Sequence, residues 1–194
     1  ESLKGSIKIT RKSFEASAKN SKKTHIQQPK ELHATLREYQ TEGYRWLMFL
    51  NKHRLGGCLA DDMGLGKTLQ TLNMLLKHAE EQGYHAGPVN NENHLGQLDL
   101  FAQHENSQKH IRPSLVIMPA SLIHNWENEI RKFTPSLTYL NYTGSQRFEL
   151  QKSIKDVHLV LTTYGTIRND FKDFEDLVFD YIILDESQLI KNPT

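Results

Sequence analysis

Two groups of residues in this sequence have the right types and spacing to act on a phosphate chain. The first is the run Gly-Leu-Gly-Lys-Thr at residues 64–68, and the second is the carboxylate pair at residues 185 and 186. Glycines such as Gly64 and Gly66 let backbone N–H groups approach a phosphate, and a following helix turns its positive end toward the anion. Lys67 would then reach the terminal phosphates, and the Thr68 hydroxyl would hold Mg²⁺.

The carboxylate pair directly follows an apolar segment, residues 181–184, which predicts a strand. Asp185 would bind Mg²⁺ through water, because this ion gives up its hydration shell reluctantly. Glu186 would orient or deprotonate the attacking water. A regulatory module that binds nucleotide without hydrolysing it is the alternative, but such a scaffold has no need of Glu186.

The segments on either side of the glycine-rich turn predict a strand, a loop and a helix. Residues 58–60 are a short apolar run that predicts a buried strand. Residues 68–79 predict a helix, because apolar residues recur at helical spacing. These residues are Leu69, Leu72, Leu75, Leu76 and Ala79. Asp61 stands six residues before Lys67, where the strict phosphate-loop pattern has a glycine.

A second helix is predicted upstream, where Thr35 and Glu38 have the spacing of a capping box. The apolar stripe predicted for this helix consists of Leu36, Tyr39, Gly43, Trp46, Leu47 and Leu50. Gln40 falls outside that stripe. Its side-chain amide can donate and accept hydrogen bonds, but taken alone Gln40 would be an ordinary solvated residue.

Three more apolar runs predict strands, at residues 115–118, 137–142 and 157–163. Ser121 is expected to cap the helix after the first of them, with Leu122, Trp126, Ile130 and Phe133 at periodic positions. Strands that alternate with helices in this way predict an α/β fold, a parallel sheet with helices on both faces.

Several of these segments resemble one family. Residues 61–68, Asp-Asp-Met-Gly-Leu-Gly-Lys-Thr, are similar to the phosphate loop of helicase superfamily two, and residues 36–47 resemble its glutamine motif. Residues 119–135 resemble motif Ia of the Swi/Snf branch, the chromatin-remodeller-like ATPases. The resemblance covers residues 32–194 apart from an insertion. It implies the first RecA-like lobe of an ATP-driven translocase on double-stranded DNA, with ATP and Mg²⁺ as ligands and Gln40 on the adenine.

The same resemblance implies contacts to DNA phosphates at two strand-to-helix turns, through Ser121 in one and through Thr162 and Thr163 in the other. An RNA helicase shares the chemistry but fits Trp46 and residues 121–126 less well. The complete motor of the family has a second lobe, whose arginines complete the ATP site. We therefore expect this sequence to be part of a motor that binds ATP weakly by itself and hydrolyses little.

Two segments are expected to lie outside this lobe. Residues 1–31 form a basic extension with eight Lys or Arg against three Glu. Residues 84–112 form a polar insertion without sustained periodicity. Within it, residues 97–101 resemble the peptide by which bacterial repair proteins dock on the sliding clamp, with Gln97, Leu98, Leu100 and Phe101 as contacts. The alternative is a short amphipathic turn that folds back on the lobe.

Composition excludes several other classes of protein. The net charge of +1 excludes a uniformly basic nucleic-acid coat. The single cysteine, Cys58, excludes an internal disulfide and suits a reducing compartment. No apolar run is long enough to cross a bilayer, so an intracellular protein without a membrane partner is expected.

Overall fold

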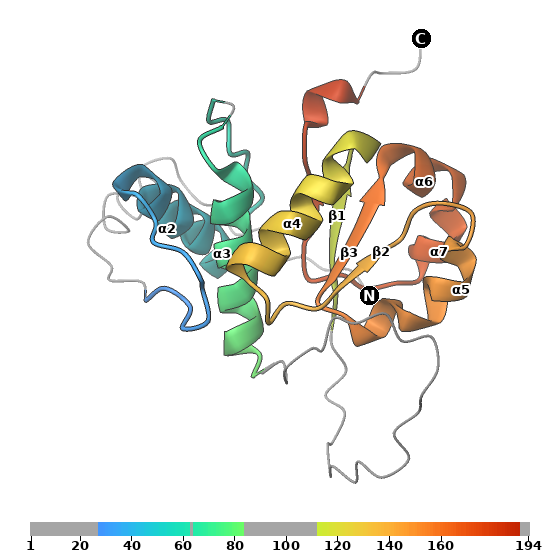
Figure 1. Cartoon of the computed structure of the whole chain (residues 1–194), viewed down its shortest axis with the longest axis horizontal. Helices are drawn as coiled ribbons and strands as arrows, with labels where there is room; N and C mark the ends of the chain where they lie inside the picture. The colour runs from blue at the N-terminus through green and yellow to red at the C-terminus, as the bar shows by residue number, and fades with distance from the viewer. Residues whose placement is uncertain (1–26, 63, 84–111, 191–194) are drawn as a thin grey trace, which may run out of the picture. The chain divides into compact units, whose positions relative to one another are not determined.

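The computed structural model describes residues 27–62, 64–83 and 112–190 (Figure 1). The chain divides into two compact units, Glu1–His78 and Ala79–Thr194, and each is described by itself. None of the helices in the described ranges has both the length and the apolar character needed to cross a membrane. The basic extension up to residue 26 and the insertion at residues 84–111, with the clamp-like peptide, lie outside the described residues.

The first unit contains helix α2 (Glu38–Lys52) and the start of helix α3 (Lys67–Glu81). The capping box predicted from Thr35 and Glu38 is wrong, because the N-cap of α2 is Arg37 and Glu38 is already helical. The N–H of Arg37 instead donates to Oε1 of Gln40 at 3.0 Å. The amide of Gln40 therefore satisfies the helix end that the hydroxyl of Thr35 was expected to satisfy.

The buried face of α2 differs from the predicted stripe by about one position. Gln40, Tyr44 and Met48 lie four residues apart and are buried, followed by Phe49 and Leu50. Tyr39, which was predicted to be inside, is 37% exposed, whereas Gln40 is 8% exposed. A polar side chain can occupy the buried face here because its amide is hydrogen-bonded.

Helix α3 confirms the prediction made from its leucine spacing. All five predicted apolar positions are buried, namely Leu69, Leu72, Leu75, Leu76 and Ala79. Just beyond the helix, Gly83 has a φ of 73°, and its N–H donates to the carbonyl of Glu80 at 2.9 Å. This left-handed glycine ends the helix, as is common at C-termini.

The strand predicted at residues 58–60 does not form. The segment has no regular secondary structure, and Cys58 and Ala60 are exposed, so the prediction of a buried strand that contains Cys58 is wrong. The run is only three residues long and follows Gly56 and Gly57, which contribute no side chains to a core. No strand of the described ranges pairs with it, and a strand needs such a neighbour for its backbone groups.

The second unit is built on a four-stranded sheet in the order β2-β3-β1-β4 (Figure 1). Its strands are β1 (Ser114–Met118), β2 (Tyr139–Asn141), β3 (Leu159–Thr163) and β4 (Ile182–Leu184). Each adjacent pair is parallel. The parallel sheet and four of the predicted strands are confirmed, with β2 shorter than expected.

Helices connect these parallel strands. After β1 come the short 3₁₀ helix η1 (Ala120–Leu122) and α4 (Ile123–Phe133), and after β2 come α5 (Arg147–Leu150) and the 3₁₀ helix η2 (Gln151–Asp156). After β3 come α6 (Tyr164–Asn169) and α7 (Phe171–Glu175), and β4 leads into the 3₁₀ helix η3 (Ser187–Leu189).

Both faces of the central strands are buried, as the continuous apolar runs predicted. On one face, Leu115, Ile117 and Val160 form a core with residues of the connections, namely Tyr142, Ile154 and Phe174. Alternate residues point to the opposite face of a strand. On that face Val116 and Leu161 are 0% exposed. Helix α4 contacts both edges of the sheet, because Asn141 of β2 donates to Glu127 at 3.0 Å and the neighbouring Trp126 donates to Asp185, just after β4, at 2.8 Å.

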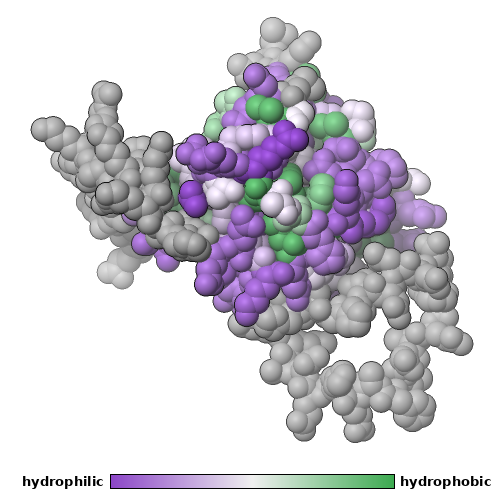
Figure 2. Space-filling view, turned by 60° about the vertical axis from the view of Figure 1, so that its left-hand side comes forward, coloured by the Kyte–Doolittle hydropathy of each residue, from purple (hydrophilic) through white to green (hydrophobic). Residues whose placement is uncertain are grey.

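The edge strand β4 is the exception to this burial. Ile182 is 63% exposed and Leu184 is 47% exposed. Among the described strands, β1 is the only one that pairs with β4, so the outer edge of β4 has no described partner. Elsewhere, hydrophilic side chains cover most of the described surface on the face in Figure 2, with hydrophobic patches between them.

Candidate functional site

The glycine-rich turn has a left-handed backbone at both of its glycines. Gly64 has a φ of 82° and Gly66 a φ of 77°, both in the left-handed region. A Cβ on Gly66 would lie 2.5 Å from Nε2 of Gln40. The loop therefore owes its shape to glycine and leads directly into α3, whose first residue is Lys67.

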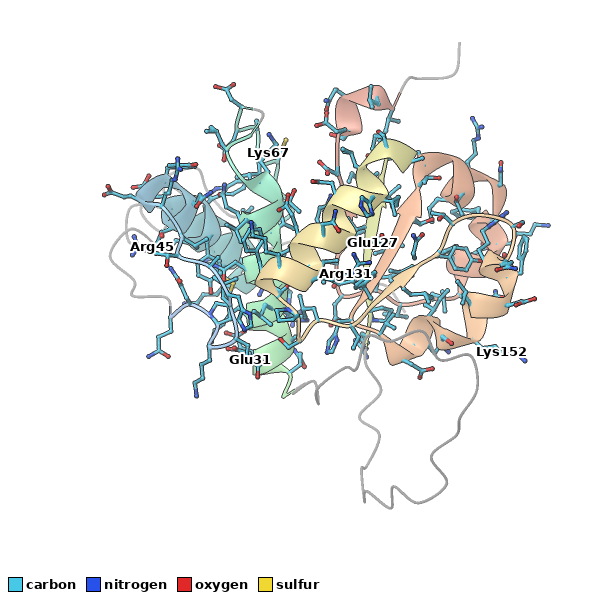
Figure 3. All side chains as sticks on the ribbon, in the orientation of Figure 1. Glu31, Arg45, Lys67, Glu127, Arg131 and Lys152 are labelled. Carbon is cyan, nitrogen blue, oxygen red and sulfur yellow. The ribbon has the colours of Figure 1, made fainter. Side chains whose placement is uncertain are left out.

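Lys67 closes this loop on itself. Its ammonium group donates to the carbonyl oxygens of Asp61 at 2.7 Å and Asp62 at 2.9 Å. Figure 3 shows Lys67 at the start of α3. The carboxylate of Asp61 accepts from Nε2 of Gln70 at 3.3 Å. The residue that replaces the usual glycine thus ties the loop to α3.

Gln40 links the start of α2 to the same loop. Its Oε1 accepts from the N–H of Arg37, and its Nε2 donates to the carbonyl of Leu65 at 3.1 Å. A side-chain amide has two hydrogens and two lone pairs. These contacts use one of each and leave one of each for adenine. The adenine contact therefore stays a prediction, and the structure adds that Gln40 supports the loop.

A hydroxyl and a carboxylate, those of Thr68 and Asp185, are the oxygen donors that suit Mg²⁺. Thr68 lies half-buried in the first turn of α3. In the ranges that the structure describes, no cluster of three or more His, Cys, Asp or Glu side chains could hold a metal ion. The roles of Thr68 and Asp185 toward Mg²⁺ stay predictions.

Asp185 lies at the carboxyl end of β4 and is held from several sides. Its N–H donates to the carbonyl of Ile117 at 2.9 Å, which extends the sheet by one residue. Its Oδ2 accepts from Nε1 of Trp126 at 2.8 Å, and its Oδ1 accepts from the N–H of Glu186 at 3.0 Å. Its main-chain carbonyl accepts from the hydroxyl of Tyr164 at 2.7 Å.

Sequence reasoning missed both aromatic contacts to Asp185. It treated Trp126 only as a core residue of the helix after β1, where it is indeed 2% exposed. A buried indole N–H normally has a hydrogen-bond acceptor. The sequence therefore indicates that Trp126 has such a partner, but it does not identify Asp185 as that partner. Burial, and then the charges of Asp185 and Glu186, raise the pKa of Tyr164. Its hydroxyl therefore keeps the proton that it donates.

Glu186 has an unusual backbone conformation. Its φ of 51° and ψ of 43° are left-handed, and Arg54 is the only other described residue besides glycine with a positive φ. Such conformations cluster at functional sites, where the surrounding structure holds them in place. The side chain of Gln188 donates to the carboxylate of Glu186. Gln188 thus contacts the group that is expected to activate the water.

The three residues expected to contact DNA differ in their surroundings. Ser121 is exposed in η1, but it is not the cap of α4, because that N-cap is Leu122 and receives no side-chain bond. Thr163 caps α6 by accepting from the N–H of Thr166 at 3.1 Å. Thr162 is 0% exposed and donates to the carbonyl of Tyr142 at 2.9 Å. The side chain of Thr162 is therefore part of the core.

The structure collects these residues in two places. Gln40, Gly66 and Lys67 surround the loop of the first unit. Ser121, Thr163 and Asp185 follow the neighbouring strands β1, β3 and β4 of the second unit, and the carboxyl ends of parallel strands share one edge of a sheet. On α4, the guanidinium group of Arg131 lies 3.7 Å from the carboxylate of Glu127, measured from Nη2 to Oε2 (Figure 3).

Known proteins resemble most of this chain. It is 40% identical over 169 residues to human TATA-binding protein-associated factor 172, covering 84% of this chain and 8% of the relative. It is 34% identical over 179 residues to the chromatin-remodeling ATPase INO80 of Pyricularia oryzae, covering 86% of this chain and 8% of that protein. The chain thus spans about a twelfth of the length of these relatives.

A solved structure shows the same fold. The Sulfolobus solfataricus SWI2/SNF2 ATPase core in complex with dsDNA matches with a TM-score of 0.66 and 34% sequence identity, covering 88% of this chain and 30% of that one. The family model of the SNF2-related domain matches residues 39–194. With the glycine loop and the Asp185-Glu186 turn in the expected order, the chain belongs to the SNF2-related family.

Proposed function

We propose that the chain is the first ATPase lobe of an ATP-dependent translocase on double-stranded DNA. The observation that carries this proposal is the loop of Gly64 and Gly66, whose left-handed backbone leads into α3 with the ammonium group of Lys67 at its start. Family membership and the dsDNA named with the Sulfolobus core support the same function.

In this proposal the loop N–H groups and Lys67 bind the phosphates of ATP, and Gln40 contacts the adenine. Lys67 exchanges the carbonyls of Asp61 and Asp62 for phosphate oxygens, which carry full negative charge and bind an ammonium group more strongly. Mg²⁺, when bound, neutralises charge on the phosphates. Thr68 and Asp185 would hold it, and Glu186 would orient or deprotonate the attacking water.

Replacement of Lys67 by alanine tests the nucleotide site. It removes a charge-assisted contact worth roughly 1.5–3 kcal/mol, so affinity should fall about ten- to a hundredfold. Isothermal titration calorimetry with Mg·ATP measures this loss. Lys52→Ala, at the exposed end of α2, is the matched control and should bind as the unmodified chain does. Equal binding by Lys67→Ala would refute the proposal.

We also propose that hydrolysis by the chain alone is slow. The family's transition-state arginines belong to a second lobe, and loss of an arginine finger lowers phosphoryl-transfer rates by about 10³–10⁵. The test is ATP turnover by residues 1–194 with duplex DNA, single-stranded DNA and RNA in parallel. Robust DNA-stimulated turnover would show that no second lobe is required. Stimulation by RNA in place of duplex DNA would favour an RNA helicase.

Double-stranded DNA is the proposed partner, bound through its phosphates at the turns of Ser121 and Thr163. At Thr162 the buried hydroxyl leaves only the main chain to contribute. Because the net charge is close to zero, binding should be weak, independent of sequence and strongly reduced by salt. Fluorescence anisotropy at low and physiological salt measures this, and tight binding that ignores salt would contradict it. DNA as substrate also implies an intracellular location.

Docking of residues 97–101 on a bacterial sliding clamp remains a separate proposal that rests on the sequence alone. Leu98, Leu100 and Phe101 would enter an apolar groove while Gln97 anchors the peptide by hydrogen bonds. The test is titration of labelled clamp with this chain and with the Leu100→Ala/Phe101→Ala variant. Absence of binding by the unmodified chain, or equal binding by both, would refute it.

A further inference from the structure

We infer that Trp126 and Tyr164 are positioning residues that fix the orientation of the Asp185 carboxylate for Mg²⁺. This inference rests on the proposed function, which gives Asp185 its role toward the metal. Neither aromatic residue needs to touch nucleotide, metal or DNA to act in this way. Both belong to helices of the second unit that follow neighbouring strands of the sheet.

Trp126 holds the carboxylate itself. It lies on α4 and is 2% exposed, and its indole N–H is a single donor that points at Oδ2 of Asp185 at 2.8 Å. The opposite oxygen, Oδ1, accepts from the N–H of Glu186 at 3.0 Å. With one donor on each oxygen, rotation of the carboxylate would break at least one bond. A large buried ring also cannot move without disturbing the packing around it.

Tyr164 holds the main chain of the same residue. Its hydroxyl donates to the carbonyl of Asp185 at 2.7 Å from the first position of α6. This carbonyl immediately precedes Glu186, whose left-handed φ of 51° needs support from its surroundings. The bond thus fixes where β4 ends and where the strained turn begins. Two donors from separate helices therefore control one residue, one through its side chain and one through its backbone.

Such contacts matter because Mg²⁺ demands near-ideal geometry from its ligands and from the waters between them. Hydrogen-bond partners behind a metal ligand orient it, and their removal typically costs 10–100-fold in metal affinity or activity. An oriented carboxylate can accept the water shell of the ion without losing freedom at that moment. A freely rotating carboxylate would lose that freedom on binding.

The test uses Trp126→Phe and Tyr164→Phe, which each remove one hydrogen-bonding group and keep the aromatic ring. A fluorescent ATP analogue is titrated onto the chain at fixed concentration while Mg²⁺ is varied. We expect the Mg²⁺ concentration at half-maximal binding to rise about tenfold in Trp126→Phe. A smaller rise is expected in Tyr164→Phe, because the carboxylate keeps its own donors. Binding of the analogue without Mg²⁺ should not change in either variant.

Matched controls are Trp46→Phe and Tyr139→Phe, which make the same chemical changes away from Asp185. Asp185→Asn gives the reference for lost Mg²⁺ dependence, and Trp126→Phe should add nothing to it in the double variant. A purely structural role for Trp126 would instead weaken binding equally with and without Mg²⁺, and that result would overturn the inference.

A second measurement does not depend on the variants at Trp126. The chain has two tryptophans, so Trp46→Phe identifies the indole N–H resonance of Trp126 by nuclear magnetic resonance. Addition of Mg·ADP should shift that resonance, whereas ADP without Mg²⁺ should shift it less. Identical spectra would overturn the inference.

Failure of the proposed function and failure of this inference alone would give different results. If the unmodified chain binds the analogue without any dependence on Mg²⁺, the role of Asp185 in the proposed function fails, and the inference fails with it. If the unmodified chain depends on Mg²⁺ and both phenylalanine variants show the same dependence, the proposed function stands and the inference alone is overturned.

Discussion

The phosphate loop and the turn after β4 both contain left-handed backbone, but they are built in different ways. In the loop the left-handed residues are Gly64 and Gly66, whereas after β4 the left-handed residue is Glu186. Glycine adopts this conformation freely, while other residues pay about 1–2 kcal/mol. The loop thus uses residues that adopt the left-handed conformation without strain. The turn instead keeps the carboxylate of Glu186 at a position where glycine would cost less conformational energy.

The surroundings of the two turns differ accordingly. The loop holds itself together largely through its own carbonyls and Lys67, with Gln40 as support. The turn after β4 depends on Trp126 and Tyr164, which come from other elements. Substitutions in the loop should therefore change its shape, whereas substitutions in the turn should change its chemistry more than its fold.

The strongest test of this difference is Gly66→Ala. Alanine would have to adopt the left-handed backbone of Gly66. Its Cβ would overlap Nε2 of Gln40, and Gln40 would lose its hydrogen bond to the carbonyl of Leu65. Strain and the lost hydrogen bond together should destabilise the first unit by about 2–3 kcal/mol. Urea unfolding measures the change. The control is Gly56→Ala, where a Cβ would meet open space, and an equal effect of both substitutions would contradict this account.

Acid should lower the stability of the second unit by protonating Asp170, which pairs with Arg147. Asp170 is 7% exposed and accepts from Nη2 of Arg147 at 2.9 Å. The hydrogen bond from Arg147 holds the pKa of Asp170 below its usual range. This pair therefore stabilises the fold fully above the unfolded pKa of about 3.9. The stabilisation is lost as pH falls below that value toward the lower, folded pKa.

The measurement is the thermal unfolding midpoint of the second unit as a function of pH. Asp170→Asn should lower the unfolding midpoint at neutral pH. The midpoint of this variant should also decrease less in acid than the midpoint of the unmodified chain. Asp176→Asn, which alters an exposed carboxylate at the end of α7, should leave the curve unchanged. The pair would have no such role if Asp170→Asn followed the curve of the unmodified chain.

The smallest expected effect is a gain in stability from Glu186→Gly. Glycine relieves the left-handed strain but also adds freedom to the unfolded chain, so the net gain should be at most about 1 kcal/mol. Denaturant midpoints compare this variant with Glu186→Gln, which keeps the strain and should not gain stability. A loss of stability in Glu186→Gly would mean that the carboxylate and Gln188 contribute more than the strain costs.

Elements whose buried face follows from a local pattern of apolar residues could be predicted from the sequence. Helix α3 and strands β1 and β3 have apolar patterns that are sufficient to place them, and the carboxyl end of β4 delivered Asp185 where its motif predicted. The stripe of α2 was displaced, because Gln40 is buried through a bond to Leu65, 25 residues away. Local periodicity treats glutamine as a surface residue and contains no information about that partner.

The contacts around Asp185 were beyond sequence reasoning for a similar reason. Trp126 and Asp185 are 59 residues apart, and Tyr164 and Asp185 are 21 residues apart. Apolar spacing assigns Trp126 and Ile130 to the same buried face without distinguishing a donor among them. The failed strand at residues 58–60 shows the opposite limit, since an apolar run forms a strand only where a neighbour completes its hydrogen bonds.

The outer edge of β4 has a practical consequence for anyone who purifies this chain. Ile182 and Leu184 present exposed apolar side chains beside backbone groups that no described strand pairs with. Edges of this kind recruit strands from other molecules, so concentrated solutions should become turbid or form soluble aggregates with time. A charged residue on such an edge is how natural sheets prevent this, and Ile182→Lys is therefore the substitution that should keep the chain in solution.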